Sequence, residues 1–293
     1  MTKPQVPQAA IDLYDVYTHA PLPRRVFLDR LAKLTGSTAA ATALLPLLEN
    51  SYVRAQTVPE DDPALVTETV QAGALAAYVA KPADAEGPLP AVVVIHENRG
   101  LNPHIRDVAR RAALAGYVAI APDYLSADGT PTPADEDQAR EEISALDPAE
   151  TIANGLSVLA YARSGRDDVS GRVGVIGFCW GGGQANALAV HDPALDAAVA
   201  FYGRQPAAED AAKIRAALLL HHAELDEGVN AGIEAYTGAL DAAGVTYEMH
   251  MYPGVNHAFH NDTNAARYDA EAATLAWQRT IAFLDRHLKA GGG

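Results

Sequence analysis

Residues 172–183 read Arg-Val-Gly-Val-Ile-Gly-Phe-Cys-Trp-Gly-Gly-Gly. After the arginine, the apolar run is typical of a strand buried on both faces of a parallel sheet. The Gly-x-Cys-x-Gly pattern, leading into a helix of small residues, is typical of a nucleophile elbow with cysteine in place of the usual serine. The alternative is a buried cysteine in an ordinary glycine-rich turn. Because the following helix N-terminus favours a thiolate, we predict that Cys179, the chain's only cysteine, is a nucleophile.

Apolar runs and helical patterns alternate on both sides of this elbow. We predict an early strand or hairpin over 70–79 and further strands over 91–95, 117–121, 197–202, 217–221 and 245–252. Helices are predicted between them, with a long one over 264–288. The stretch 126–148, rich in Asp, Pro, Thr and Glu, is expected to pass over the sheet edge as a lid. The alternation predicts an α/β fold, a mostly parallel central sheet flanked by helices with its site at the carboxyl ends of the strands.

The composition restricts the classes of partner. The chain has 293 residues, 49% of them hydrophobic, enough for one large catalytic domain over 61–290 with an N-terminal extension over 1–60 and a disordered tail at 291–293. The net charge of 22 − 37 = −15 opposes binding to nucleic acid or to an anionic membrane surface. No apolar run approaches the ~20 residues of a membrane helix. We expect a small-molecule substrate and leave a homodimer open.

The N-terminal extension has two interpretations. Residues 23–28 resemble a twin-arginine export motif, which would direct the protein to the periplasm. Charged residues interrupt the apolar stretch behind this motif, and residues 50–55 are a poor cleavage site. Leucine and phenylalanine instead recur at helical spacing, at Phe27, Leu28, Leu31 and Leu34. We therefore favour a retained helix packed on the catalytic domain of a cytoplasmic protein, with export as the alternative.

A nucleophilic thiol needs a base, and the base needs an acid that orients it. In chain order after an elbow, the acid comes first and the histidine second. Asp226, in the turn after the strand at 217–221, is predicted to be the acid, with Glu224 as the alternative. His257, in the turn after the next strand, is predicted to be the base, with His260 as the alternative.

Acyl transfer also needs two N–H donors for the developing oxyanion. The backbone N–H groups of Trp180, directly after the nucleophile, and of Asn98, after the strand at 91–95, are predicted to supply them. No metal or organic cofactor is expected. The sequence has no cysteine cluster, no His-Glu-x-x-His motif and no convincing ligand spacing among its histidines.

Taken together, these segments resemble the dienelactone hydrolase family. The segments are Gly177-Phe178-Cys179-Trp180-Gly181-Gly182, Asp226, His257-Ala258-Phe259, Ile95-His96-Glu97-Asn98-Arg99-Gly100-Leu101 and the strand end Ala121-Pro122-Asp123. The resemblance covers roughly residues 65–288. It implies an α/β-hydrolase fold and an enzyme that cleaves a carboxylic ester or lactone through an acyl-enzyme intermediate.

The same resemblance implies a role for Glu97. In enzymes of this family, a glutamate in this loop contacts the resting thiol and accepts its proton when substrate binds. A carboxylate beside a thiol opposes formation of the thiolate by like-charge repulsion. The alternative for Glu97 is a loop carboxylate that caps the next helix.

The sequence departs from the family where the substrate would be held. Family members that act on a carboxylated lactone use one arginine after the Pro-Asp strand end and one after the catalytic histidine. Residues 124–128 and 260–262 contain no arginine here. The substrate-binding candidates are Arg204, Arg99, Tyr124 and Phe259. The two arginines could equally form surface ion pairs, so the natural substrate stays open.

The sequence leaves two alternative functions open. The same site could act on an amide or a carbon–carbon bond, which the pocket shape would decide. Alternatively, the single thiol could serve a redox-sensing or binding protein with little turnover. The complete order of nucleophile, acid and histidine favours the hydrolase.

Overall fold

A central sheet carries the fold of the computed structural model, which describes residues 6–20, 22–52 and 56–289. Its strands are β1 (Leu65–Ala72), β2 (Leu75–Pro82), β3 (Leu89–Ile95), β4 (Val118–Pro122), β5 (Val169–Phe178), β6 (Ala197–Phe201), β7 (Ala217–Ala223) and β8 (Tyr247–Tyr252). They lie in the order β1-β2-β4-β3-β5-β6-β7-β8. The pairs β1–β2 and β2–β4 are antiparallel, and from β4 to β8 every pair is parallel. The predicted α/β fold is confirmed.

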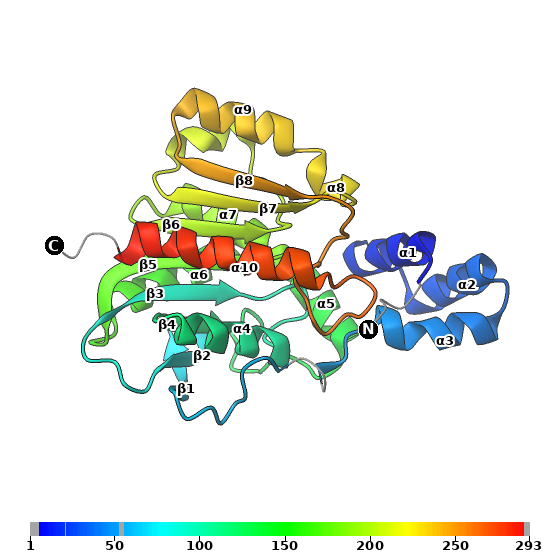
Figure 1. The fold of residues 1–293 in the computed structure, drawn as a ribbon, viewed down its shortest axis with the longest axis horizontal. Helices are drawn as coiled ribbons and strands as arrows, with labels where there is room; N and C mark the ends of the chain where they lie inside the picture. The colour runs from blue at the N-terminus through cyan, green and yellow to red at the C-terminus, as the bar shows by residue number, and fades with distance from the viewer. Residues whose placement is uncertain (1–5, 21, 53–55, 290–293) are drawn as a thin grey trace.

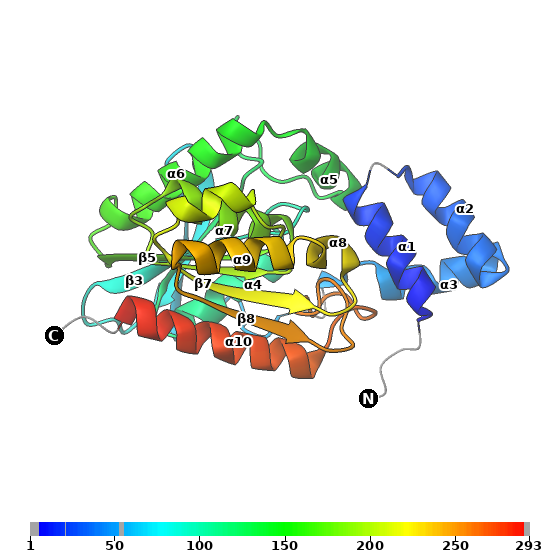
Figure 2. The same cartoon turned by 90° about the horizontal axis from the view of Figure 1, so that it is seen from above.

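Helices cover both faces of this sheet (Figures 1 and 2). The helices of the catalytic part are α4 (Pro103–Leu114), α5 (Glu136–Ala145), α6 (Pro148–Ser164), α7 (Trp180–His191), α8 (Glu227–Asn230), α9 (Ile233–Ala243) and α10 (Ala270–Leu284), with a 3₁₀ turn at Ala208–Lys213 and a π turn at Asp285–Lys289. Strand β3 shows why two layers form: Val92 and Val94 pack toward α4 and α10, whereas Val93 and Ile95 pack toward α6 and α7. Successive side chains of a strand point to opposite faces, so a continuously apolar strand has both faces buried.

The N-terminal extension forms three helices, α1 (Gln8–His19), α2 (Arg24–Thr35) and α3 (Thr38–Leu48), beyond the carboxyl ends of the parallel strands (Figures 1 and 2). Its core is aromatic: the Phe27 ring stacks on Tyr17 at 4.4 Å and meets Tyr14 edge-on at 5.9 Å. The exposed Leu34 contributes little, since Phe27 and Leu31 are the buried residues of α2. No single described helix is long and apolar enough to cross a membrane. Only α2 and α3 together meet the length and composition test, and they are bent by 113°.

Hydrogen bonds fasten these helices to the catalytic part at both ends of α1. Gln8 Nε2 donates to Asn256 Oδ1 at 2.5 Å, and Asn98 Nδ2 donates to the Thr18 carbonyl oxygen at 2.7 Å. The end of α3 is held similarly, because Ala266 N donates to Leu47 O at 3.0 Å. The extension is therefore anchored to the two loops that carry the predicted base and oxyanion donor.

Two elements differ in their bounds from the sequence prediction. The strand or hairpin predicted over 70–79 is a longer hairpin of β1 and β2, which turns at Gly73, where φ is +63° and an added Cβ would lie 2.3 Å from the Ser157 hydroxyl oxygen. The helix predicted over 264–288 begins only at Ala270, since Asp269 accepts from Ala272 N as its N-cap and Asn264 instead bonds the end of α3. The predicted lid over 126–148 contains α5, and the predicted tail at 291–293 lies outside the described residues.

We expect Phe27→Ala to loosen the extension, because it empties a fully buried aromatic position worth about 3–5 kcal/mol. Amide hydrogen exchange over residues 8–48 should rise strongly while exchange in β3 and β5 stays slow. Val26→Ala, at the neighbouring and 37% exposed position, is the matched control and should leave exchange unchanged. Equal effects of the two variants would contradict the packing described for this segment.

Candidate active site

Cys179 lies on a strained turn between β5 and α7, with φ 55° and ψ −113°. Few L-residues adopt this backbone conformation, and it is sterically possible here because nearby residues of the turn are glycines. A Cβ on Gly177 would lie 1.9 Å from the Gly181 carbonyl oxygen, and a Cβ on Gly181 would lie 2.4 Å from the His96 carbonyl oxygen. The two glycines of the motif are thus required by close backbone contacts, as the elbow predicts.

The predicted acid and base meet at the same edge of the sheet. Asp226 follows β7 and is the N-cap of α8, where Oδ1 accepts from Val229 N at 3.2 Å. His257 follows β8, and its Nδ1 lies 2.6 Å from Asp226 Oδ2. Both side chains are buried. Since the carboxylate can only accept a hydrogen bond, Nδ1 carries a proton. His257 Nε2 is then the atom that can take up or release a proton.

The alternative acid and base lie elsewhere. The Glu224 carboxylate accepts from Gly254 N at 2.7 Å at an exposed position. His260 is buried among aromatic rings, 5.1 Å from Phe178 and 5.1 Å from Phe201 between ring centroids. Asp226 and His257 are therefore the pair that the structure brings together with the elbow.

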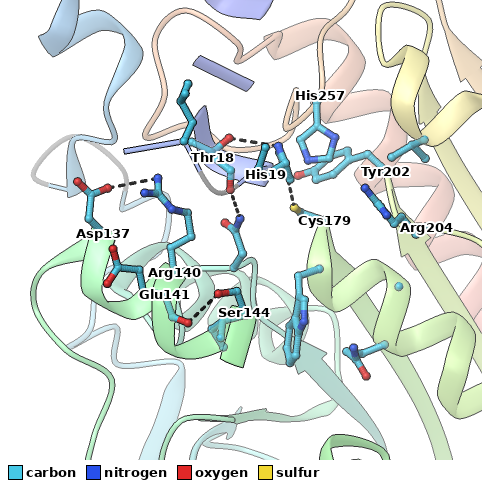
Figure 3. A pocket seen from close by; sticks show the side chains of 18 of the residues that line it. Thr18, His19, Asp137, Arg140, Glu141, Ser144, Cys179, Tyr202, Arg204 and His257 are labelled. Carbon is cyan, nitrogen blue, oxygen red and sulfur yellow. Dashed lines mark hydrogen bonds and ion pairs between the residues drawn. The ribbon is translucent and has the colours of Figure 1, made fainter. Parts of the chain in front are cut away.

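A second histidine contacts the thiol. His19, the last residue of α1, has Nε2 3.1 Å from Cys179 Sγ (Figure 3). Its ring meets the His257 ring edge-on at 4.6 Å. Its Nδ1 lies 2.9 Å from the Asp15 carbonyl oxygen and 3.3 Å from the Asp15 carboxylate. The sulfur thus lies between two imidazoles that come from opposite ends of the chain.

These surroundings change the acidity of the thiol. Burial alone would raise the pKa of Cys179, but the positive charges of His19 and then His257 lower it to about 6. The N-terminal end of α7 acts in the same direction, because helix N-termini stabilise a thiolate. Both effects favour the thiolate over the thiol at neutral pH.

The pKa values of the two histidines shift in the opposite direction, upward. Burial would lower the pKa of His257, yet the Cys179 thiolate and the carboxylates of Asp226 and Asp15 raise it well above the usual value. Burial would likewise lower the pKa of His19, but the thiolate and Asp15 raise it to about 9 against the opposing charge of His257. Burial opposes ionisation of Asp226, while His257 lowers its pKa. The group is a chain of alternating charges that stabilise one another.

The predicted oxyanion donors border the same space. Trp180 is the first residue of α7, where a helix leaves its N–H groups without intrahelical acceptors. Asn98 lines the same cavity, and its side chain donates to the Thr18 carbonyl oxygen. The Trp180 ring stacks on His96 at a centroid distance of 5.4 Å, which holds the turn in place.

Glu97 has a different partner from the one that the family resemblance implies. It is 3% exposed, and its Oε2 accepts from Asn261 Nδ2 at 2.6 Å. Thr263 N in turn donates to Asn261 Oδ1 at 3.1 Å, so the amide is held in place. The hydrogen bond to the sulfur comes from His19 instead.

A cavity of about 980 Å³ opens over the sulfur (Figure 3). Four parts of the chain form most of its wall: the end of α1 with the segment that follows, α5, α7 and the loop after β6. Asn98, Val229 and His257 complete it. The predicted lid is therefore part of the wall, through α5. Arg204 lies on this wall, and no described residue pairs with its guanidinium.

The structure does not place the other three substrate-binding candidates on this wall. Arg99 is buried, with its guanidinium 2.7 Å from Glu136 Oε2 and 3.1 Å from the Tyr14 hydroxyl, so it joins the extension to α5. Tyr124 is buried against Trp180 at 5.2 Å. Phe259 packs on Tyr252 at 4.9 Å in the core. Because these three side chains are buried, they cannot contact a substrate in the cavity. Their role is to pack the loops around it.

One atom each from His19, Cys179 and His257 lies within 4.8 Å of the other two, so the three side chains form one compact set. Sequence spacing could not show this set, because 160 residues separate His19 from Cys179.

His19 is also the residue that the sequence analysis missed. The available signal was local: Ile11, Tyr14 and Thr18 recur at helical spacing and mark an amphipathic helix, but nothing in the sequence says what that helix covers.

Comparison with known proteins extends these observations. The family model described as "Dienelactone hydrolase family" matches residues 75–288. A protein of Methylorubrum extorquens named "Putative carboxymethylenebutenolidase" is 35% identical over 72% of this chain and 76% of its own. The crystal structure of a dienelactone hydrolase-type protein from Klebsiella pneumoniae is 32% identical, with a TM-score of 0.70 over 76% of this chain and 99% of its own.

A thermostable esterase from Pseudomonas putida shares the fold at 21% identity, with a TM-score of 0.63 over 98% of this chain and 99% of its own. That coverage includes the N-terminal helices, whereas the family model begins at residue 75. The extension, with His19, thus lies outside the residues that the family model matches.

We expect iodoacetamide to alkylate Cys179 with a rate that rises with pH and is half-maximal near pH 6, because the thiolate is the reacting form and its pKa is lowered to about 6. Mass spectrometry of protein quenched at intervals measures the rate. Free glutathione under the same conditions is the reference, with a midpoint near ~8.5 for an ordinary thiol. A protein midpoint at the glutathione value would refute the electrostatic description of the site.

Proposed function

Since the chain belongs to the dienelactone hydrolase family and is a hydrolase of carboxylic ester or lactone bonds, we propose that Cys179, His257 and Asp226 carry out the reaction through an acyl-enzyme. The observation that carries this proposal is the 2.6 Å bond between His257 and Asp226 beside a thiol on a strained elbow. The order of nucleophile, base and orienting acid supports acyl transfer.

In the acylation step the Cys179 thiolate attacks the carbonyl carbon, and a C–S bond forms. The carbonyl oxygen becomes an oxyanion, which the backbone N–H groups of Trp180 and Asn98 stabilise. When the intermediate collapses, the C–O bond breaks and the alkoxide receives the proton of the His257 imidazolium. In a lactone this alcohol remains attached to the acyl group.

In the deacylation step His257, now neutral, takes a proton from water as the water oxygen attacks the thioester carbon. The C–S bond breaks, the acid leaves, and the thiolate and the imidazolium are restored. Asp226 keeps the imidazole in one tautomer and stabilises its charged form throughout. Glu97 contributes by shaping the loop of Asn98 through its bond to Asn261.

We expect turnover to fall in step with alkylation of Cys179, because the chain has no other cysteine that iodoacetamide could modify. The measurement is hydrolysis of a panel of activated esters and unsaturated lactones by samples alkylated to increasing extents. Cys179→Ala, alkylated in parallel, controls for reaction at other residues. Turnover that survives complete alkylation would remove Cys179 as the nucleophile, and a reactive thiol without turnover on any member would favour a redox or binding role.

We further propose that the substrate carries an anionic group, held by Arg204. The other arginines on the wall are already paired: Arg24 lies 3.2 Å from an Asp137 oxygen and Arg140 lies 3.3 Å from an Asp137 oxygen. Arg204 is exposed to the cavity with no such partner. A relative from Methylorubrum extorquens is named for a butenolide that bears a carboxymethylene group, which is a substrate of this kind.

Arg204→Gln should therefore raise KM for a carboxylated lactone by about tenfold or more, the range of a lost charge-assisted hydrogen bond. Hydrolysis of a neutral ester of similar size should hardly change. Arg215→Gln, which replaces an exposed arginine on the same connection but off the wall, is the control. Steady-state kinetics on the two substrates provide the comparison, and an equal change on both would argue against anion recognition by Arg204.

We also propose that the extension stays on the working protein and is not removed after export. Its residues 18–20 and 22–24 form one wall of the cavity, and removing them would expose the thiol to solvent. This retention supports the cytoplasmic assignment over cleavage in the periplasm.

A further inference from the structure

We infer that His19 is a further catalytic residue, which holds Cys179 as a thiolate before substrate arrives. This inference rests on the hydrolase mechanism proposed above and adds to it a group from outside the family match. Its basis is direct contact: His19 Nε2 lies 3.1 Å from the reacting sulfur, on the cavity wall (Figure 3).

The orientation of the His19 ring is set by its own helix. Nδ1 lies 2.9 Å from the Asp15 carbonyl oxygen, which can only accept, so Nδ1 carries a proton. Nε2 then shares one proton with the sulfur, either as S–H donating to neutral His19 or as N–H⁺ donating to a thiolate. The Asp15 carboxylate at 3.3 Å and the C-terminal end of α1 both favour the protonated imidazole.

The other charged groups around His19 are compatible with this state. His257 opposes the charge of His19 across 4.6 Å between ring centroids, and the thiolate lies within 4.8 Å of a ring nitrogen of each histidine. Arg267 lies 3.5 Å from the Asp15 carboxylate and moderates its effect. The His19 side chain is 29% exposed, so solvent in the open cavity weakens the interactions without removing them.

The position of His19 is also fixed by the loop that holds the oxyanion donor. Asn98 Nδ2 donates to the carbonyl oxygen of Thr18 at 2.7 Å, one residue before His19. This bond links the C-terminal end of α1 to the catalytic part directly beside the sulfur. Because Glu97 is bonded to Asn261, its carboxylate does not take the place of His19.

This arrangement has a mechanistic consequence. His19 keeps its proton through the whole cycle, so the proton balance of both steps is unchanged. Its charge stabilises the sulfur as an attacking thiolate in acylation and as a leaving thiolate in deacylation. Removing the charge should therefore slow both steps at pH values below the ordinary pKa of a thiol.

The test is His19→Gln, which keeps a hydrogen-bond donor of similar reach but has no charge. We expect the alkylation midpoint of Cys179 to move up by about one pH unit or more, which lowers the rate at pH 6 by about fivefold or more. The acidic limb of the kcat/KM profile should move with it. Asp15→Asn should give a smaller shift in the same direction, and imidazole added to His19→Ala should restore part of the wild-type rate.

The matched control is His191→Gln. His191 also ends a helix, α7, and its Nδ1 lies 2.8 Å from the carbonyl oxygen four residues earlier, but it lies on the exposed surface. Intact mass and circular dichroism establish that each variant retains the extension and is folded. An unchanged midpoint in folded His19→Gln would overturn the inference and leave His257 as the sole partner of the thiolate.

Alkylation does not depend on turnover, so the two proposals can fail separately. A shifted midpoint in a protein that hydrolyses no ester or lactone would support His19 as the partner of the thiolate and reject the mechanism. An unshifted midpoint with turnover that tracks alkylation would support the mechanism and reject the role of His19.

Discussion

The backbone turn at Cys179 is the constraint on which the rest of the site depends. A residue at φ 55° and ψ −113° is unfavourable by itself, and the strand before it and helix after it must hold it there. Gly177 and Gly181 allow this because their neighbours approach too closely for any Cβ. The turn places the sulfur above the carboxyl end of the sheet and at the start of α7, where the loops that follow β3, β7 and β8 can reach it.

Electrostatics then distribute the roles among the groups that meet there. A buried thiol beside a carboxylate would stay protonated, whereas a thiol between two imidazoles ionises. Glu97 is hydrogen-bonded to Asn261, whereas His19 and His257 lie beside the sulfur. Each histidine is in turn backed by an aspartate, Asp15 or Asp226. The net charge of the group stays small, which makes several ionised side chains tolerable in a buried place.

The same geometry explains why the extension matters to function although it lies apart from the core of the sheet. Its aromatic cluster around Phe27 forms a separate packing unit, joined to the catalytic part by hydrogen bonds and by the ion pairs Arg24–Asp137 and Asp15–Arg267. Because the segment supplies both a wall of the cavity and His19, a change in it alters the surroundings of the sulfur while the sheet stays intact.

The sequence by itself determined the fold class and the places of Cys179, Asp226 and His257, because strand–turn–helix patterns are local and parallel strands bring their carboxyl ends together. It could not determine that Arg99, Tyr124 and Phe259 are turned away from the cavity, since side-chain direction in a loop depends on what packs against it. Nor could it reveal His19, which reaches the sulfur only through the docking of α1, 160 residues away in the chain. Contacts between distant segments are set by tertiary packing, and no local pattern encodes them.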